Sequence, residues 1–200
     1  MKGFVQANLS KMVKELGEDK VKTILSHFIC PLNKDVEGFL RDKSIEFAKQ
    51  GLAATHLVFT SYKGSLALIG YFTLACKIII IYRNNLSKSL QKRISKFAQY
   101  DQNLRRYSLS APLIAQLGKN YNINYDKLIS GDELLHMACE KVNQIQVDLG
   151  GKVVYLECED KPKLIYSSHG FVNFGRRSLE GDEQDIFQGN SLVQMLKYFK

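Results

Sequence analysis

Apolar and polar residues alternate along the chain with two periods, one typical of helices and one typical of strands. Apolar residues recur at helical spacing in residues 8–20, 34–50, 87–98, 131–149 and 162–169. Alternating or continuously apolar runs typical of strands occupy residues 21–30, 52–60, 66–75, 111–122, 152–158, 171–174 and 191–199. Helices and strands that follow one another in this way predict an α/β (α+β) fold, with helices packed on a sheet.

Residues that begin or end elements support several of these boundaries. Asn8 or Ser10 can cap the first helix, and Asn33 can cap the second. Residues 61–65 (SYKGS) are a turn signal, so the strands on either side are expected to be antiparallel neighbours. Residues 176–190 are polar and predict a long loop before the last strand.

The stretch from Ala111 to Gly151 reads as a strand, a polar loop and a helix. Ser130 and Glu133 form a capping box at the start of that helix, and Gly131 lets the main chain come close to a ligand. Unpaired amides and the helix dipole make such a start a natural anion site, although an ordinary strand–loop–helix connection is the alternative. The strand at 152–158 follows directly, so the two strands are expected to be parallel.

Residues 77–107 carry much of the positive charge. An amphipathic helix is expected there, with its apolar residues on one side and its basic residues on the rest. The basic residues of that helix are Lys88, Lys92, Arg93 and Lys96. Arg105-Arg106-Tyr107 follows, and a basic surface with aromatic neighbours suits nucleic acid. A solvated helix packed on a sheet is the simpler interpretation of the same residues.

Composition limits the classes of protein to consider. The chain has 200 residues, 45% of them hydrophobic, which fits a single domain with a real core. It contains no apolar run long enough for a membrane span and no signal peptide, so a cytoplasmic protein without membrane contact is expected. The four cysteines and four histidines are scattered, which argues against a metal site or a disulfide framework. The net charge of +8 favours a polyanionic or phosphate-bearing partner.

Four local motifs, in this order along the chain, resemble the GNAT N-acetyltransferase superfamily and in particular its toxin-like and phage-type members. They are Cys30-Pro31-Leu32-Asn33 before a helix, residues 68–75 (LIGYFTLA), residues 130–135 (SGDELL) and residues 166–171 (YSSHGF). The resemblance covers about residues 21–199. It implies a mixed, mostly antiparallel sheet of about six to seven strands flanked by helices. Residues 77–107 would then be a basic helical insertion between the third and fourth strands, and residues 1–20 an N-terminal helix.

The same resemblance implies acetyl-CoA as the acetyl donor and a primary amine of unknown identity as the acceptor: an aminoacyl-tRNA, a protein or a small molecule. By position, the cofactor would contact the fourth strand and the loop before the following helix, at Leu117, Gly118, Asn120, Asn122, Lys127, Ile129, Ser130, Gly131 and Asp132. Tyr166 would protonate the leaving thiolate, and Glu157 or Glu159 would accept the proton of the amine, unless a water does so. Backbone amides would stabilise the oxyanion.

Other interpretations stay open. The pyrophosphate loop keeps only the last glycine of the family pattern, at Gly131, and Asp126 stands where the family has glutamine or arginine. A catalytically weak or inactive GNAT-like binding module is therefore one alternative, and a basic nucleic-acid-binding protein is another. RNA or another polyanion would bind through Lys88, Lys92, Arg93 and Lys96. A homodimer and an antitoxin partner are compatible with the resemblance.

Overall fold

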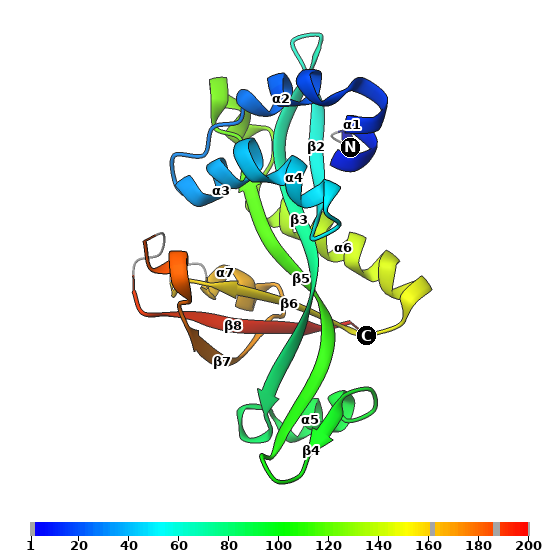
Figure 1. Ribbon diagram of the computed structural model, residues 1–200, viewed down its shortest axis with the longest axis vertical. Coiled ribbons are helices and arrows are strands. Elements are labelled where there is room, and N and C mark those ends of the chain that lie inside the picture. The colour runs from blue at the N-terminus through cyan, green and yellow to red at the C-terminus, as the bar shows by residue number, and fades with distance from the viewer. Residues whose placement is uncertain (1–2, 161–162, 186–188, 200) are drawn as a thin grey trace. The chain divides into compact units, whose positions relative to one another are not determined.

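The computed structural model describes residues 3–160, 163–185 and 189–199. Its strands are β1 (Phe4–Asn8), β2 (Ala54–Tyr62), β3 (Ser65–Tyr82), β4 (Gln99–Asp101), β5 (Arg106–Lys119), β6 (Val153–Cys158), β7 (Val172–Ser178) and β8 (Ser191–Tyr198). Its helices are α1 (Leu9–Leu16), α2 (Glu18–Ser26), α3 (Lys34–Gly38), α4 (Ser44–Lys49), α5 (Lys88–Ile94), α6 (Gly131–Leu149) and α7 (Lys163–Ser168), as Figure 1 shows.

The strands form one mixed sheet in the order β1-β2-β3-β5-β6-β8-β7, with β4 paired to β5 outside this path. The pairs β1–β2, β2–β3, β4–β5, β6–β8 and β7–β8 are antiparallel. β5 and β6 are parallel, at a register pair that joins Leu113 and Tyr155. The expected strand–helix–strand unit with parallel strands is therefore confirmed, as is the mostly antiparallel character of the sheet.

The chain divides into two compact units. The first comprises Met1–Ala75 and Ile114–Lys141, and the second comprises Cys76–Leu113 and Val142–Lys200. The strands β3 and β5 and the helix α6 each contribute to both units.

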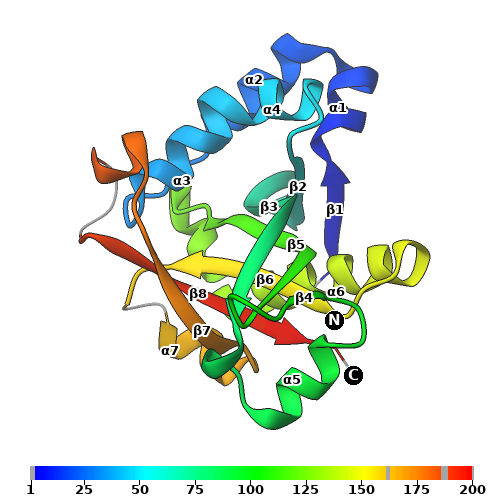
Figure 2. The ribbon, with the colours of Figure 1, turned by 60° about the horizontal axis from the view of Figure 1, so that its bottom comes forward.

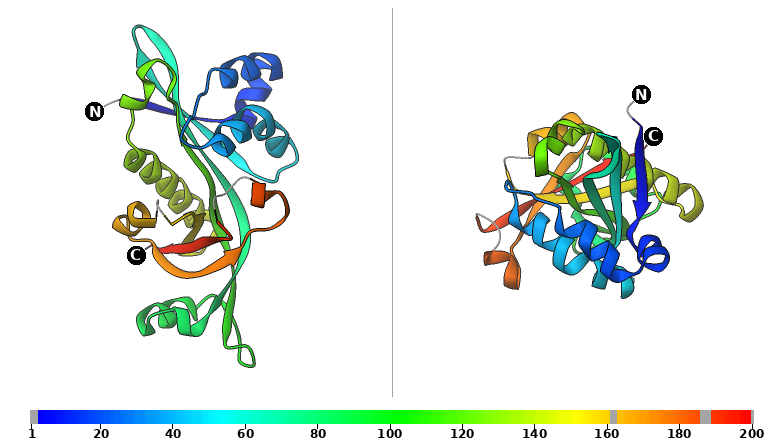
Figure 3. Two further views of the ribbon diagram at one scale, coloured as in Figure 1. Left: turned by 90° about the vertical axis from the view of Figure 1, so that its left-hand side faces the viewer. Right: turned by 90° about the horizontal axis from the view of Figure 1, so that it is seen from above.

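In the first unit, helices cover both faces of the sheet (Figure 3). Tyr71 of β3 is fully buried, packs edge-to-face on Phe28, and donates a hydrogen bond of 2.6 Å from its hydroxyl to the carbonyl of Val36 in α3. The neighbouring residue Gly70 faces the other way, because a Cβ there would lie 3.4 Å from Leu134 of α6. Alternate residues of β3 thus meet α3 on one face and α6 on the other.

The second unit has its own core around α5 and the ends of β3 and β5 (Figure 2). Leu90 and Ile94 of α5 pack in one cluster with Ile79 and Ile81 of β3. After Ala75, β3 alternates between buried Ile79 and Ile81 and exposed Ile78 and Ile80. This alternation is the pattern of a strand covered on one face only.

Several predictions about elements are wrong. Residues 21–30 were expected to form a strand, but α2 covers most of them, because Val21 and Leu25, four residues apart, are both fully buried on one helix face. The sheet has eight strands rather than six to seven, because two strands were not predicted: β1 forms beside β2, and β4 pairs with β5. Of the two caps that the sequence allowed for α1, Asn8 is the one observed, and its side chain accepts a hydrogen bond of 3.2 Å from the Lys11 amide.

The segment at 77–107 is not simply a helical insertion. β3 continues through it to Tyr82, the helix α5 has seven residues, and β4 and the start of β5 complete it. Residues 176–190 are also more structured than a loop, because β7 extends to Ser178 and a 3₁₀ turn spans Gly181–Asp185. The helix expected from residue 162 is α7, and Pro162 itself lies outside the described residues.

Candidate active site

The start of α6 has the capping box that the sequence predicted. The Glu133 amide donates to the Ser130 hydroxyl oxygen at 3.1 Å, and the Ser130 amide donates to the Glu133 carboxylate at 2.7 Å. A Cβ at Gly131 would meet no heavy atom within 4 Å, so open space lies beside the first turn. Ser130, Gly131 and Asp132 are exposed, whereas Ile129 before them is buried and anchors the turn.

The strand residues before this helix are packed more tightly. Gly118 is buried, and a Cβ there would lie 2.4 Å from Val36 Cγ1 and 3.0 Å from Tyr71 Cε1. Glycine is therefore required by the packing of the first unit, whatever else the strand binds. Leu117 beside it is partly buried, and Lys127 is exposed at the end of a 3₁₀ helix that spans Asn122–Lys127.

Asn120 is a buried hub just after β5. Its side-chain oxygen accepts from the Ile29 and Asn122 amides, both at 3.0 Å. Its side-chain nitrogen donates to the carbonyls of Leu68 at 2.8 Å and His27 at 3.4 Å. The Asn122 side chain also donates to the His27 carbonyl, at 3.0 Å. These amide groups fix the loop, and a contact of Asn120 or Asn122 with a cofactor stays a prediction.

Tyr166 lies in α7 and is held by the end of that helix. Gly170 has φ +82°, the Phe171 amide donates to the Tyr166 carbonyl at 3.1 Å, and the Gly170 amide donates to the Ser167 carbonyl at 3.0 Å. This is a Schellman motif, and the ring contact of Tyr166 with Phe171, at 6.0 Å between centroids, is its usual apolar contact. The motif explains why glycine and phenylalanine follow the tyrosine at this spacing.

Burial raises the pKa of the Tyr166 phenol to about 12, with a smaller contribution from Cys158. The phenol therefore stays protonated throughout the neutral range. Burial also raises the pKa of the Cys158 thiol to about 11, so this cysteine is an uncharged neighbour. Tyr166 can thus donate a proton or a hydrogen bond, but it cannot serve as a base.

Glu157 of β6 is clamped by Arg177 of β7. Arg177 Nε and one terminal nitrogen donate to the two carboxylate oxygens of Glu157 at 2.7 and 2.6 Å. The terminal nitrogens also donate to Glu183, at 2.6 and 2.7 Å. The Tyr155 hydroxyl donates a hydrogen bond to the Glu157 carboxylate, and Lys77 Nζ lies 3.5 Å from Glu157 Oε1. One guanidinium therefore bridges two carboxylates, with the Glu157 side chain only 10% exposed.

These contacts set the charge states of the cluster. Burial acts to raise the pKa of Glu157, but the hydrogen bonds from Arg177 and Tyr155 outweigh it and hold that pKa below its ordinary value. The hydrogen bond from Arg177 likewise lowers the pKa of Glu183, and the two carboxylates raise the pKa of Arg177. Glu157 is therefore a carboxylate at neutral pH and a weak base.

Glu159 does not share the strand with Glu157, because β6 ends at Cys158. Glu159 lies partly buried just beyond the end of β6. The catalytic roles of Tyr166, Glu157 and Glu159 stay predictions.

A pocket of about 290 Å³ lies over the Glu157 cluster in the second unit. Lys77, Tyr155, Arg177 and Gln194 line it, and all four also interact with Glu157. The sequence did not single out Arg177, which fell in a predicted loop. The only signal was its place among basic residues, and nothing in the sequence pairs it with a glutamate twenty positions earlier.

The described part of the chain holds no cluster of three or more histidine, cysteine or acidic side chains placed to bind a metal ion. Within those same residues, none of the helices combines the length and apolar character needed to cross a membrane.

Comparison with known proteins gives matches in structure only. No protein-family profile and no curated protein matches the sequence. A crystal structure of a bacterial toxin aligns with a TM-score of 0.63 at 18% identity, over 99% of this chain and 92% of that one. AtaT complexed with acetyl-methionyl-tRNAfMet aligns with a TM-score of 0.62 at 18% identity, over 96% and 94% of the two chains. A mutant of KacT with one tyrosine replaced by phenylalanine aligns with a TM-score of 0.64 at 15% identity, over 97% of this chain and 94% of that one. The chain therefore has the GNAT fold of the AtaT and KacT toxins, which confirms the fold that the sequence resemblance implied.

Proposed function

We propose that the chain is an acetyl-CoA-dependent N-acetyltransferase whose acceptor is the α-amino group of an aminoacyl-tRNA. The observation that carries this proposal is the fold match along nearly the whole chain with AtaT, whose structure has been solved in complex with acetyl-methionyl-tRNAfMet and, as AtaTR, with acetyl-CoA. The first of these ligands is the product that such a reaction would form.

The start of α6 supports the cofactor part of the proposal. The first turn of α6 is exposed to solvent, and Gly131 has free space beside it. Main-chain amides there can receive a pyrophosphate without a cationic side chain. Of the predicted cofactor residues in this region, Lys127, Ser130, Gly131 and Asp132 are exposed and so accessible to the cofactor.

The reaction joins the amine nitrogen to the thioester carbonyl, passes through a tetrahedral oxyanion and expels coenzyme A as a thiolate. The amine loses one proton, and the thiolate gains one. Tyr166 is the proposed donor to the thiolate, because its phenol is held by the end of α7 and stays protonated at neutral pH.

The state of Glu157 favours an α-amine over a lysine side chain as the acceptor. Its pKa is lowered and its oxygens are bound by Arg177, so it is poorly suited to remove a proton from an amine. An α-amino group has a pKa of ~7.7–8.0 and a lysine amine one of ~10.4, so near pH 7.5 the α-amine is neutral roughly 250 times more often. A site without a strong base therefore acts best on an α-amine, and water or Glu159 can take the proton.

Thiol release from acetyl-CoA tests the proposal. The purified chain should release thiol with an aminoacyl-tRNA, but not with the deacylated tRNA and far more slowly with a lysine-rich peptide. Tyr166→Phe should lower kcat by roughly 10²–10⁴-fold with little change in acetyl-CoA binding, the usual size of a general-acid effect. Tyr62→Phe, which removes a hydroxyl from a partly buried tyrosine of the first unit, is the matched control and should keep full activity.

Two results would count against the enzyme. No heat on titration with acetyl-CoA, together with no thiol release, would favour the non-catalytic binding module. An unchanged rate in Tyr166→Phe would remove Tyr166 as the proton donor.

A further inference from the structure

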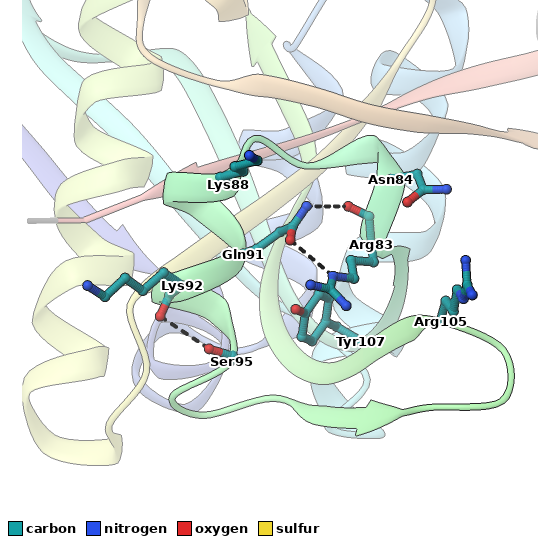
Figure 4. A pocket seen from close by; sticks show the side chains of 8 residues that line it. All are labelled: Arg83, Asn84, Lys88, Gln91, Lys92, Ser95, Arg105 and Tyr107. Atoms are coloured by element: carbon teal, nitrogen blue, oxygen red, sulfur yellow. Dashed lines mark hydrogen bonds between the residues drawn. The ribbon is translucent and has the colours of Figure 1, made fainter.

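The second unit contains a basic cleft of about 780 Å³ between α5 and the turn that joins β4 to β5 (Figure 4). Four cationic side chains line it, namely Arg83, Lys88, Lys92 and Arg105. The rest of the lining is polar or aromatic and consists of Asn84, Gln91, Ser95 and Tyr107. No aliphatic side chain and no carboxylate belongs to the lining among the described residues.

The cleft is held in shape by hydrogen bonds to neutral groups. Gln91 donates to the carbonyl of Arg83 at 2.9 Å and accepts from Arg83 Nε at 3.1 Å, as Figure 4 shows. The Arg83 guanidinium also lies over the Tyr100 ring, 5.9 Å from its centroid. The Arg83 amide donates to the Arg105 carbonyl at 2.9 Å, which ties the two arginine-bearing segments together. The Arg83 side chain is therefore positioned before any ligand arrives.

The positive charge of the cleft is not neutralised within the protein. None of the four cations lies within 4.0 Å of a carboxylate in the part of the chain that the structure describes. Cations just outside it behave differently, since Arg106 is 3.8 Å from Asp101 and Lys77 is 3.5 Å from Glu157. Like charges gathered without a counter-charge are typical of surfaces that bind polyanions.

We infer that this cleft binds phosphates of the RNA acceptor. The inference rests on the proposed function, because it assigns to the tRNA body a binding surface on the same chain. Arginine guanidinium groups match the geometry of phosphate oxygens, and lysines add point charge. Asn84 and Ser95 supply neutral groups that can bond to phosphate or ribose. A membrane surface is a poorer fit, because the lining lacks apolar side chains that could enter lipid.

The structure also separates the basic residues of this region into two sets. Lys88 and Lys92 line the cleft, whereas Arg93 and Lys96 do not. The Arg93 guanidinium lies over the Tyr198 ring at 5.2 Å, and Lys96 is exposed beyond the end of α5. The four lysines and arginines that the sequence grouped together are thus expected to contribute unequally to RNA binding.

Binding of a fluorescently labelled, deacylated tRNA to the full chain tests the inference without requiring acetyl transfer. If four phosphates contact the four cations, the slope of log K against log salt is about −3.6, so binding weakens about 150-fold between 50 and 200 mM salt. Lys88→Ala with Lys92→Ala should flatten the slope by about two and weaken binding at 50 mM salt at least tenfold. Lys20→Ala with Lys96→Ala removes the same charge from exposed positions outside the cleft and should change the affinity less than threefold.

Equal losses in the two double variants, or an unchanged slope in the cleft variant, would overturn the inference. So would cleft-dependent binding of phosphatidylserine vesicles or of a DNA duplex without cleft-dependent binding of tRNA. Heat of binding with acetyl-CoA should be the same for both variants and the parent chain. A chain that binds tRNA through the cleft but releases no thiol would refute the proposed function and leave the cleft assignment intact.

Discussion

Replacing Arg177 with methionine should destabilise the second unit strongly. The change removes the shared partner of two carboxylates and leaves Glu157, whose side chain is only 10% exposed, as an uncompensated charge. Breaking a buried ion pair from one side costs about 3–5 kcal/mol. Two features reduce this cost: Lys77 lies 3.5 Å from Glu157, and the Glu183 side chain is 27% exposed. We therefore expect the variant to lose about 3 kcal/mol of unfolding free energy at pH 7.

The pH dependence of this effect has a definite sign. The carboxyls of Glu157 and Glu183 have pKa values in the folded protein below their ordinary ones. The Arg177 contacts therefore stabilise the fold fully above pH ~4.3, the ordinary pKa of glutamate. This stabilisation is lost as the pH falls through the lowered pKa values. In the variant, Glu157 is buried without its partner and takes up a proton more easily. The difference in unfolding free energy between parent and variant should therefore be largest at pH 7 and shrink toward pH 4.

Urea denaturation at pH 7, 5.5 and 4, followed by far-UV circular dichroism, measures this difference. Arg177→Met with Glu157→Gln is the control, since it removes the stranded charge and should recover more than half of the stability lost at pH 7. If Arg177→Met lowers the unfolding free energy by less than about 1 kcal/mol, or by an amount that does not change with pH, the charge of Arg177 does not stabilise the fold through Glu157 and Glu183.

Two further predictions concern the first unit. Gly118→Ala should lower the free energy of unfolding in urea by about 1–3 kcal/mol, because the new Cβ would lie 2.4 Å from Val36 Cγ1. Gly131→Ala should leave that free energy unchanged or raise it by up to about 1 kcal/mol, because a Cβ there meets no heavy atom within 4 Å. Equal effects at the two glycines would contradict the packing argument. Ser130→Ala should cost about 1 kcal/mol through loss of the α6 cap, and Ser130→Thr should restore most of it. A neutral Ser130→Ala would mean that the capping hydrogen bond contributes nothing to stability.

The sequence predicted those parts of the fold that depend on local signals. The capping box of α6, the Asn33 cap of α3, the turn at Lys63-Gly64 and the parallel strands around α6 were all within reach, because each depends on residues close together in the chain.

Features that depend on distant partners were missed. The predicted strand ended at residue 75, yet β3 continues to Tyr82, and Lys77 within it lies 3.5 Å from Glu157 of β6. Five residues at the start of the chain form β1 only because β2 is beside them. Arg177 was also missed, because its partners Glu157 and Glu183 lie on other elements of the chain. α2 is a different case, in which Val21 and Leu25 carried a helical signal that their β-branched neighbours obscured.

The hub at Asn120 limits which amino acids this position can accept. Its side chain must accept two hydrogen bonds and donate two others within one buried planar group. Aspartate has no donor, leucine has neither group, and glutamine is one methylene too long for the same space. A protein that shares this loop can therefore differ at nearly every residue around it and still need asparagine here. We therefore expect asparagine at this position in proteins that share the loop, even where the rest of their sequences differ.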